Sequence, residues 1–327
     1  MTLPVPEAPA AGAPAARAPI DSYAARAGVG VRRRRPGARF LLHAIVILIV
    51  VAWLVPTLGL LINSFRPAAD VSGSGWWNSL FPPWNFTLDN YTHVLEQNNL
   101  GDAFINSLFI TIPSTVIPIV VASFAAYAFA WMPFKGRSWL FIGTVTLMAI
   151  PLQMAFVPLL QLYGGGAHWT IFDTTITLFP DLDLINKPIA VWLTHTAFGL
   201  PLAIFLLHNY ISSLPADVFE AATIDGANHF GIFWRIVLPL SKPALAAFAI
   251  FQFLWVWNDY LVALIFLSQN PTASPLTIQL VNLVTSRGQG TELLPAAAFV
   301  SIIVPLIIFF SLQRYFVRGL LAGSVKG

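Results

Sequence analysis

Six long apolar stretches alternate with polar segments along the chain. They fall near residues 40–62, 103–130, 138–160, 188–211, 244–267 and 296–315. A helix needs about 20 predominantly apolar residues to cross a bilayer, and each stretch reaches that length. The pattern therefore predicts an all-α, polytopic membrane protein with six transmembrane helices.

Prolines interrupt most of these stretches, at Pro56, Pro113, Pro118, Pro151, Pro158, Pro201 and Pro305. In a soluble helix they would be costly, but neighbouring helices in a membrane can satisfy the freed carbonyl groups. Gln153 lies between Pro151 and Pro158, where a broken helix would expose backbone to a cavity. The second stretch also carries Ala122, Ala126 and Ala130 at four-residue spacing, which indicates a seam for close helix packing.

The composition supports the membrane interpretation. Hydrophobic residues make up 57% of the 327 residues and charged residues 9%, and the mean hydropathy is +0.74. Because ordinary soluble domains are about 25% charged, a soluble enzyme and a disordered regulator are excluded. The chain has no cysteine, which excludes disulfides and thiolate metal sites. Its 6 histidines show no metal-binding spacing, so no metal site is expected.

The distribution of basic residues predicts the orientation of the chain. If the N-terminus is cytoplasmic, only Arg66, Lys187 and Arg287 of the 17 Lys and Arg residues lie outside. This asymmetry is typical of proteins whose basic loops stay inside, so both termini are expected in the cytoplasm. The basic charge is thus explained by topology, and no nucleic-acid binding is expected. Residues 1–38, rich in Ala, Pro, Gly and Arg, are expected to be a disordered, basic cytoplasmic extension.

The loop at residues 213–243 differs from the others because its own pattern is helical. Ser213 is placed to cap a short helix, and Gly226 is placed to end it in a left-handed conformation. Glu220, Ala221 and Ala222 stand in the middle of this helix, where small side chains admit a partner surface and a carboxylate can pair with a cation. A second short helix is expected from His229 to Val237, ending before Pro239.

This loop resembles the "EAA" loop of permeases from binding-protein-dependent ABC importers. Glu220-Ala221-Ala222, three residues, Gly226, nine residues, Ile236, one residue and Leu238-Pro239 reproduce that pattern at every fixed position. The run Trp257-Asn258-Asp259-Tyr260 and the last residues, from Gln313 to Gly327, resemble the sugar-importer branch. Within this branch the chain is most similar to the second permease of maltose and α-glucoside (trehalose, sucrose) transporters, and Phe198-Gly199-Leu200-Pro201-Leu202-Ala203 favours the α-glucoside group.

The resemblance implies a fold and a set of partners. Residues 39–327 would form a type I ABC importer transmembrane domain in the bacterial inner membrane, with a coupling helix between helices 4 and 5. The chain would be one permease beside a second, related permease, an ATPase dimer that holds ATP and Mg, and an extracytoplasmic sugar-binding protein. The outer loop 268–295 would probe the binding protein, and the tail 316–327 would reach toward the ATPase.

The resemblance also assigns roles within the loop. Glu220 would form the ion pair with the ATPase, Gly226 would permit the turn and Leu238-Pro239 would seat the second helix. Ala221, Ala222, Asp225 and Ile236 belong to the same coupling segment. The chain itself has no G-x-x-x-x-G-K-[ST] phosphate loop and is expected to bind no cofactor.

Polar residues in the membrane stretches are candidates for the solute pathway. On one continuous helix, Gln252, Trp255 and Asp259 would share a stripe, and an amide, an indole and a carboxylate suit sugar binding. Alternatively, Asp259 caps a neighbouring helix or closes an outer gate. Asn258 and Gln153 are further candidates, whereas His195 is expected to form an interhelical hydrogen bond.

Three other functions compete with that of a sugar-importer permease for an α-linked disaccharide. An ion-coupled secondary transporter usually has repeated halves and several buried carboxylates, which this sequence lacks. An intramembrane enzyme would need a nucleophile with its base, or a metal cluster, within the stretches. A permease for another carbohydrate or a polyol in the same branch stays open.

Overall fold

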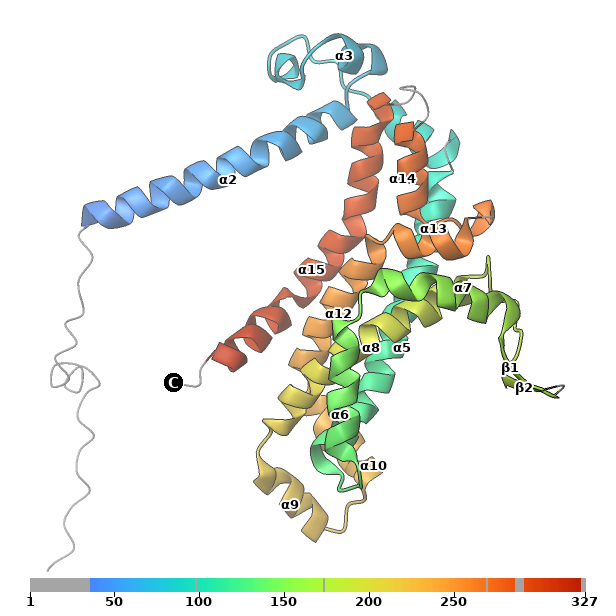
Figure 1. The fold of residues 1–327 in the computed structure, drawn as a ribbon. Helices are drawn as coiled ribbons and strands as arrows, with labels where there is room; N and C mark the ends of the chain where they lie inside the picture. The colour runs from blue at the N-terminus through green and yellow to red at the C-terminus, as the bar shows by residue number, and fades with distance from the viewer. Residues whose placement is uncertain (1–35, 98, 173, 269, 286–290, 325–327) are drawn as a thin grey trace, which may run out of the picture. The chain divides into compact units, whose positions relative to one another are not determined.

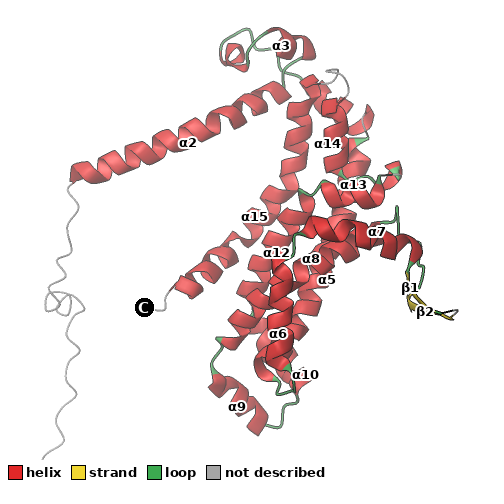
Figure 2. Ribbon diagram, in the orientation of Figure 1, coloured by secondary structure: helices red, strands yellow, loops and turns green. Residues whose placement is uncertain are grey.

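A computed structural model shows that the chain is mainly helical (Figure 1), as Figure 2 makes plain by colour. It describes residues 36–97, 99–172, 174–268, 270–285 and 291–324. Residues 1–57 and 58–327 form separate compact units. Of the predicted extension 1–38, residues 1–35 lie outside the described residues. Residues 36–38 are helical and form the start of α2 (Pro36–Ser64). α2 is an apolar helix that continues through Pro56, and its last residues, 58–64, belong to the second unit.

Among the described residues, four helices are long and apolar enough to cross a membrane, and two bent helix pairs bring the number to as many as six. The four are α2, α5 (Leu100–Trp131), α8 (Pro188–Ser212) and α15 (Leu294–Ser324). The predicted tail 316–327 is a continuation of α15 up to Ser324. The four single helices overlap four of the predicted stretches. The bent pairs are Arg137–Ala149 with Leu152–Gly165, which overlaps the third stretch, and His229–Leu240 with Lys242–Trp257, which overlaps only the first part of the fifth.

The seam on α5 packs closely against α8. Ala122 and Ala126 are completely buried, and they share one apolar core with Ala203 and Leu207 of α8. Ala130 packs against the edge of this core. Small side chains allow two helix backbones to approach closely in a membrane, so the sequence-based prediction of a packing seam is confirmed.

The third predicted span is not one helix. It consists of α6 (Arg137–Thr146), η3 (Leu147–Ala149), η4 (Leu152–Ala155) and α7 (Phe156–Gly165), with a 98° bend between its halves. The break falls at Ile150 and Pro151, both of which have extended backbone. Proline disfavours helical geometry in the residue before it, which explains the position of the break.

The fifth predicted span, 244–267, is also interrupted. α12 (Lys242–Trp257) ends before Asn258, and α13 (Leu261–Leu267) begins after Tyr260. The connection that follows contains α14 (Leu276–Thr285). Leu276 and Leu283 are buried against α5 and α15 residues, so this helix belongs to the bundle.

The predicted helical fold is confirmed, with one local exception among the described residues. The connection between α7 and α8 contains two antiparallel strands, β1 (Ala167–Ile171) and β2 (Thr174–Phe179) (Figure 2). The other short elements flank the spans: α3 (Ala68–Gly73), η1 (Trp76–Leu80), α4 (Asp89–Thr92), η2 (His93–Gln97), η6 (Pro271–Ala273) and η7 (Thr291–Leu293).

Candidate functional site

The loop after α8 forms a short helix, α9 (Ala216–Ile224), which begins directly after Pro215. The prediction that Ser213 caps this helix is wrong. The Ser213 hydroxyl instead donates to the carbonyl oxygen of Tyr210 at 2.7 Å and so belongs to the end of α8. Pro215 directly precedes the first residue of α9, and no side chain caps this end of the helix. Proline is common at the start of helices, because its missing N–H would have no partner there.

The end of α9 is built as predicted. Gly226 has a φ of +79°, in the left-handed region that glycine adopts without steric cost. The N–H of Ala227 donates to the carbonyl of Ala222, and the N–H of Gly226 donates to that of Thr223, each at 3.0 Å. These two bonds define a Schellman motif, which satisfies the last carbonyl groups and turns the chain.

α9 has one buried face and one exposed face. Phe219 and Ala222 are buried, and the Phe219 ring stacks on Trp131 of α5 with centroids 3.9 Å apart. Glu220 and Ala221 lie on the exposed face. Of the two alanines in the motif, therefore, only Ala221 is available to a partner, while Ala222 fixes the helix to the bundle. Asp217, Ile224 and Asp225 are exposed as well.

The second helix of the loop runs further than predicted. α10 (His229–Ile232), η5 (Phe233–Val237) and α11 (Leu238–Leu240) follow one another without a break, so the prediction that the helix ends before Pro239 is wrong. η5 is a wide π-type turn, and Pro239 follows it in α11. The side chain of Asn228 caps α10 by accepting from the N–H of Gly231 at 2.7 Å.

Ile236 and Leu238 pack against the same apolar core as α9, whereas Pro239 is exposed. Phe219 and Ala222 belong to that core too, together with residues of α5 and α8. The whole segment from α9 to α11 is thus attached to the bundle through its inner face. A displacement of α9 would be carried directly to α5 and α8.

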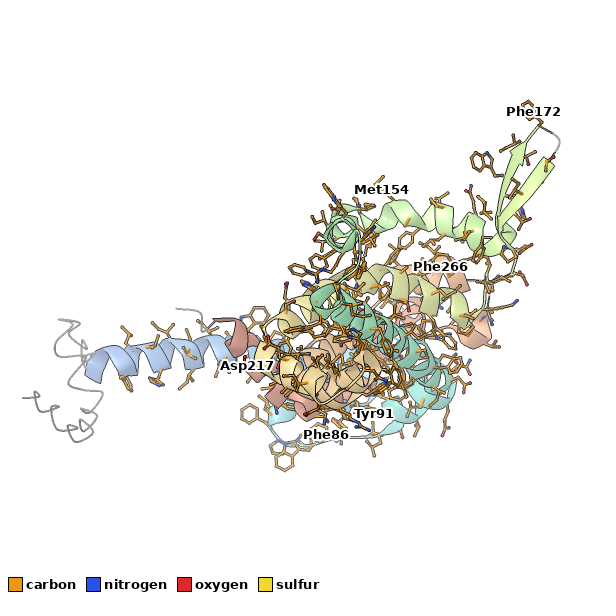
Figure 3. All side chains as sticks on the ribbon, turned by 90° about the horizontal axis from the view of Figure 1, so that it is seen from below. Phe86, Tyr91, Met154, Phe172, Asp217 and Phe266 are labelled. Atoms are coloured by element: carbon orange, nitrogen blue, oxygen red, sulfur yellow. The ribbon has the colours of Figure 1, made fainter. Side chains whose placement is uncertain are left out.

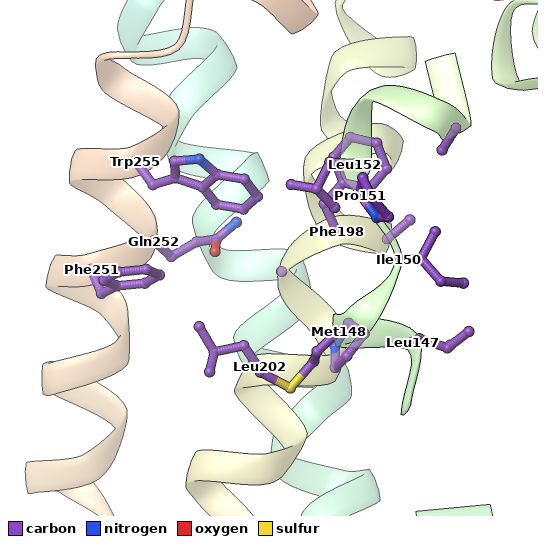
Figure 4. Close-up of a pocket in the computed structure, with 14 residues that line it drawn as sticks. Leu147, Met148, Ile150, Pro151, Leu152, Phe198, Leu202, Phe251, Gln252 and Trp255 are labelled. Atoms are coloured by element: carbon purple, nitrogen blue, oxygen red, sulfur yellow. The ribbon is translucent and has the colours of Figure 1, made fainter. Parts of the chain in front are cut away.

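A hollow of about 380 Å³ opens where the third span breaks (Figure 4). Phe251, Gln252 and Trp255 of α12 point toward Phe198 and Leu202 of α8 across it (Figure 4). The break itself supplies the remaining wall, with apolar side chains from Leu147, Met148, Ile150, Pro151, Leu152 and Ala155. Of the five residues predicted for the solute path, Gln252 and Trp255 line this hollow.

Gln252 is the buried polar group of the hollow. Its Nε2 donates to the carbonyl oxygens of Ser114 at 3.2 Å and His195 at 3.4 Å. Its Oε1 has no hydrogen-bond partner among the described residues. Gly199 makes room for this amide, because a Cβ at that position would lie 2.6 Å from Oε1. The sequence did not indicate this role of Gly199.

Asp259 lies outside the hollow, in the break between α12 and α13. Its Oδ2 accepts from the N–H groups of Val262 at 3.0 Å and Ala263 at 3.3 Å, so it caps the first turn of α13. The same oxygen is 3.7 Å from His195 Nε2. Because α12 ends at Trp257, the predicted stripe of Gln252, Trp255 and Asp259 on one helix does not exist. The alternative role for Asp259, as a helix cap, is what the geometry supports.

The other two candidates are exposed. Asn258 donates through Nδ2 to the carbonyl of Leu254 at 2.7 Å, and Gln153 lies in η4 outside the hollow. Among the described residues there is no cluster of three or more His, Asp or Glu side chains that could hold a metal ion.

Comparison with known proteins identifies the family. Residues 103–321 match the family described as "Binding-protein-dependent transport system inner membrane component". The chain is 52% identical over 288 residues to the osmoprotective compounds uptake permease protein GgtD of Synechocystis sp., covering 87% of this chain and 91% of that protein. It is 56% identical over 246 residues to the alpha-glucoside transport system permease protein AglG of Rhizobium meliloti, covering 75% of this chain and 62% of that protein.

A solved structure has the same fold. The crystal structure of a bacterial ABC transporter that imports the acidic polysaccharide alginate matches with a TM-score of 0.68 and 22% identity, over 86% of this chain and 98% of that chain. This match confirms the expected fold of an ABC importer permease. The family match and the two permease relatives agree with it, and the chain therefore belongs to the family of inner-membrane components of binding-protein-dependent transport systems.

Proposed function

We propose that this permease forms half of a translocation pathway for α-linked glucosides, such as maltose, trehalose or sucrose. We infer the substrate class from the 56% identity between this chain and an alpha-glucoside permease. As a permease subunit the chain catalyses no reaction. Energy comes from a separate ATPase dimer that holds ATP and Mg, and solute comes from an extracytoplasmic sugar-binding protein. A second, related permease completes the pathway.

The exposed face of α9 is the proposed contact with the ATPase. It offers a carboxylate, Glu220, beside a small side chain, Ala221, while Phe219 and Ala222 hold the helix to the bundle. A charge-assisted hydrogen bond from Glu220 to a cation of the ATPase would fix the contact. Movement of the ATPase would then reach α5 and α8 through Phe219. For this contact α9 must lie on the cytoplasmic side of the membrane. The proposed topology places both chain termini on that same side.

The hollow beside α12 is the proposed solute surface. Sugars are bound by side chains that combine hydroxyl hydrogen bonds with an apolar ring face. Trp255 and Phe251 supply ring faces beside Gln252, whose amide is completely buried and whose Oε1 lacks a partner among the described residues. A sugar would reach this amide only after Gln252 moves. Asn258 and Gln153 are proposed only as neighbours of the path, since neither lines the hollow.

Uptake by the reconstituted importer tests this substrate class. The chain would be assembled with its ATPase, second permease and binding protein, and uptake of labelled maltose, trehalose and sucrose would be compared with that of the β-linked cellobiose. The proposal predicts ATP-dependent uptake of at least one α-linked sugar and none of cellobiose. Uptake that needs no ATP and follows an ion gradient would contradict it and favour a secondary transporter.

A second substrate class is favoured by a specific observation, the 52% identity to an osmoprotective compounds permease over most of both chains. Polyols combine the same hydroxyl and C–H surfaces as disaccharides. Competition of unlabelled polyols with labelled trehalose would reveal such a preference. Stronger competition by the polyol than by any disaccharide would move the assignment to this class.

A further inference from the structure

The hairpin between α7 and α8 has two chemically different faces. Cross-strand pairing places Trp169 opposite Ile176 and Ile171 opposite Thr174, and side chains two residues apart share a face. Trp169, Ile171, Ile176 and Leu178 therefore lie on one face. The opposite face is polar, with His168 Nδ1 3.2 Å from Thr177 Oγ1 and the hydroxyls of Thr170 and Thr175 3.1 Å apart.

No described residue covers the apolar face. Trp169 is 60% exposed, Leu178 is 65% exposed, and Phe172 at the turn is 96% exposed. Figure 3 shows Phe172 at the far end of the two strands. A two-stranded hairpin is at best marginally stable in water without packing on its apolar side. This face therefore requires an occupant.

The base of the hairpin is attached to membrane-spanning elements. The N–H of Leu184 donates to the carbonyl of Tyr163 at 2.9 Å, which joins the segment after β2 to α7. The N–H of Asn186 donates to the carbonyl of Phe266 at 2.8 Å, which joins it to α13. The hairpin is thus anchored at its base to α7, which belongs to the third predicted span, and to α13.

The third span, which leads into the hairpin, also exposes apolar residues. Ile150, Met154 and Val157 are exposed apolar residues along the break and α7. Neither strand contains an ionisable residue other than His168, whereas Asp173 follows Phe172 in the sequence between the strands. The charged pair Lys187–Asp183 follows the hairpin, with its atoms 3.1 Å apart and exposed. A surface that combines tryptophan with aliphatic residues and has its charges at the two ends is typical of the bilayer interface.

We propose that the apolar face of the hairpin inserts into the lipid interface of the bilayer, with the threonine face toward water. Trp169 and Phe172 are the aromatic anchors, and Ile176 and Leu178 enter the acyl boundary beside them. The hairpin then holds the α7–α8 connection at the membrane surface while the bundle moves. The partner is a lipid surface, not a protein.

Because the chain has no cysteine, single labels can be placed on either face of the same strand. Ile176→Cys and Leu178→Cys would report the apolar face, and Thr175→Cys and Thr177→Cys would serve as matched controls. Each variant, assembled in the full importer and reconstituted in phosphatidylcholine bilayers, would carry a nitroxide spin label. Collision with oxygen, which concentrates in lipid, would be compared with collision with a water-soluble nickel chelate.

The proposal predicts an alternation with the period of the strand. The oxygen-to-nickel collision ratio should be several-fold higher at positions 176 and 178 than at 175 and 177. Equal nickel access on both faces would overturn the proposal. It would also be overturned if the labels at 176 and 178 were protected only after addition of the sugar-binding protein, since that result would identify a protein as the occupant.

Discussion

The imidazole Nε2 of His195 and the carboxylate Oδ2 of Asp259 lie 3.7 Å apart, and they connect α8 to the break in the fifth span. The same carboxylate oxygen accepts the N–H groups of Val262 and Ala263. The Asp259 side chain thus caps the helix that follows the break and also lies beside His195 of α8. Its carboxylate does not line the hollow that contains Gln252.

Asp259→Ala should therefore destabilise the permease without changing its preference among solutes. Loss of the cap on α13 should cost about 0.5–2 kcal/mol, which would appear as a lower temperature of thermal unfolding in detergent. Asp259→Asn keeps a capping acceptor and should lose much less stability. A changed KM for sugar in Asp259→Asn would contradict this assignment and return the residue to the solute path.

Gly199→Ala should disturb Gln252. The added Cβ would lie 2.6 Å from Gln252 Oε1, so the amide must move and its bonds to Ser114 and His195 must lengthen. In a double-mutant cycle, Gly199→Ala should be destabilising in the wild-type background and nearly neutral in Gln252→Ala, with a coupling of about 0.5–3 kcal/mol measured by thermal unfolding.

Gly143→Ala is the matched control for that cycle, because a Cβ there has nothing within 4 Å. It should leave stability unchanged or raise it, since alanine is the better helix former. Additive effects of Gly199→Ala and Gln252→Ala would show that the two residues do not share the space assigned to them.

Gly226→Ala should weaken the turn between α9 and α10. An L-residue in the left-handed conformation costs about 1–2 kcal/mol, and Gly226 has a φ of +79° with open space around its Cα. Asn tolerates this conformation better than Ala, so Gly226→Asn should retain more of the sugar-stimulated ATPase activity than Gly226→Ala. Equal activity of the alanine variant and the wild type would show that coupling does not depend on this turn.

The features predictable from sequence were those encoded by local patterns. Apolar length located the spans, and a glycine at the end of a short helical pattern located the turn at Gly226. The break at Asp259 had a local signal as well, an aspartate two residues before the apolar run of α13, but the continuous hydrophobicity of 244–267 concealed it. The alternation of Thr with apolar residues in β2 is likewise a local signal for a strand.

Other features could not be predicted, because they depend on contacts between distant segments. Nothing in the sequence near Gly199 indicates that its hydrogen faces the Gln252 amide, or that His195 approaches Asp259. The burial of Ala222 also depends on tertiary packing, because the contact between Phe219 and Trp131 of α5 defines the inner face of α9. The same contact leaves Glu220 on the outer face.

Glu220→Ala should reduce the ATPase stimulation produced by the sugar-loaded binding protein. A hydrogen bond to a charged group contributes about 1.5–3 kcal/mol, so assembly with the ATPase should weaken at least about ten-fold. Asp217→Asn, a matched change on the exposed side of the same helix, should behave like the wild type. Full stimulation in Glu220→Ala would count against the ion pair.

Site-specific cross-linking from α9 tests the central claim most directly. Ala221→Cys would be the one thiol in this chain, and a short bifunctional reagent would be applied to the assembled importer in sealed vesicles. The account predicts a covalent adduct between this chain and the ATPase subunit, protected from thiol reagents added on the outer side. No adduct with the ATPase, or ready labelling of position 221 from outside, would contradict it.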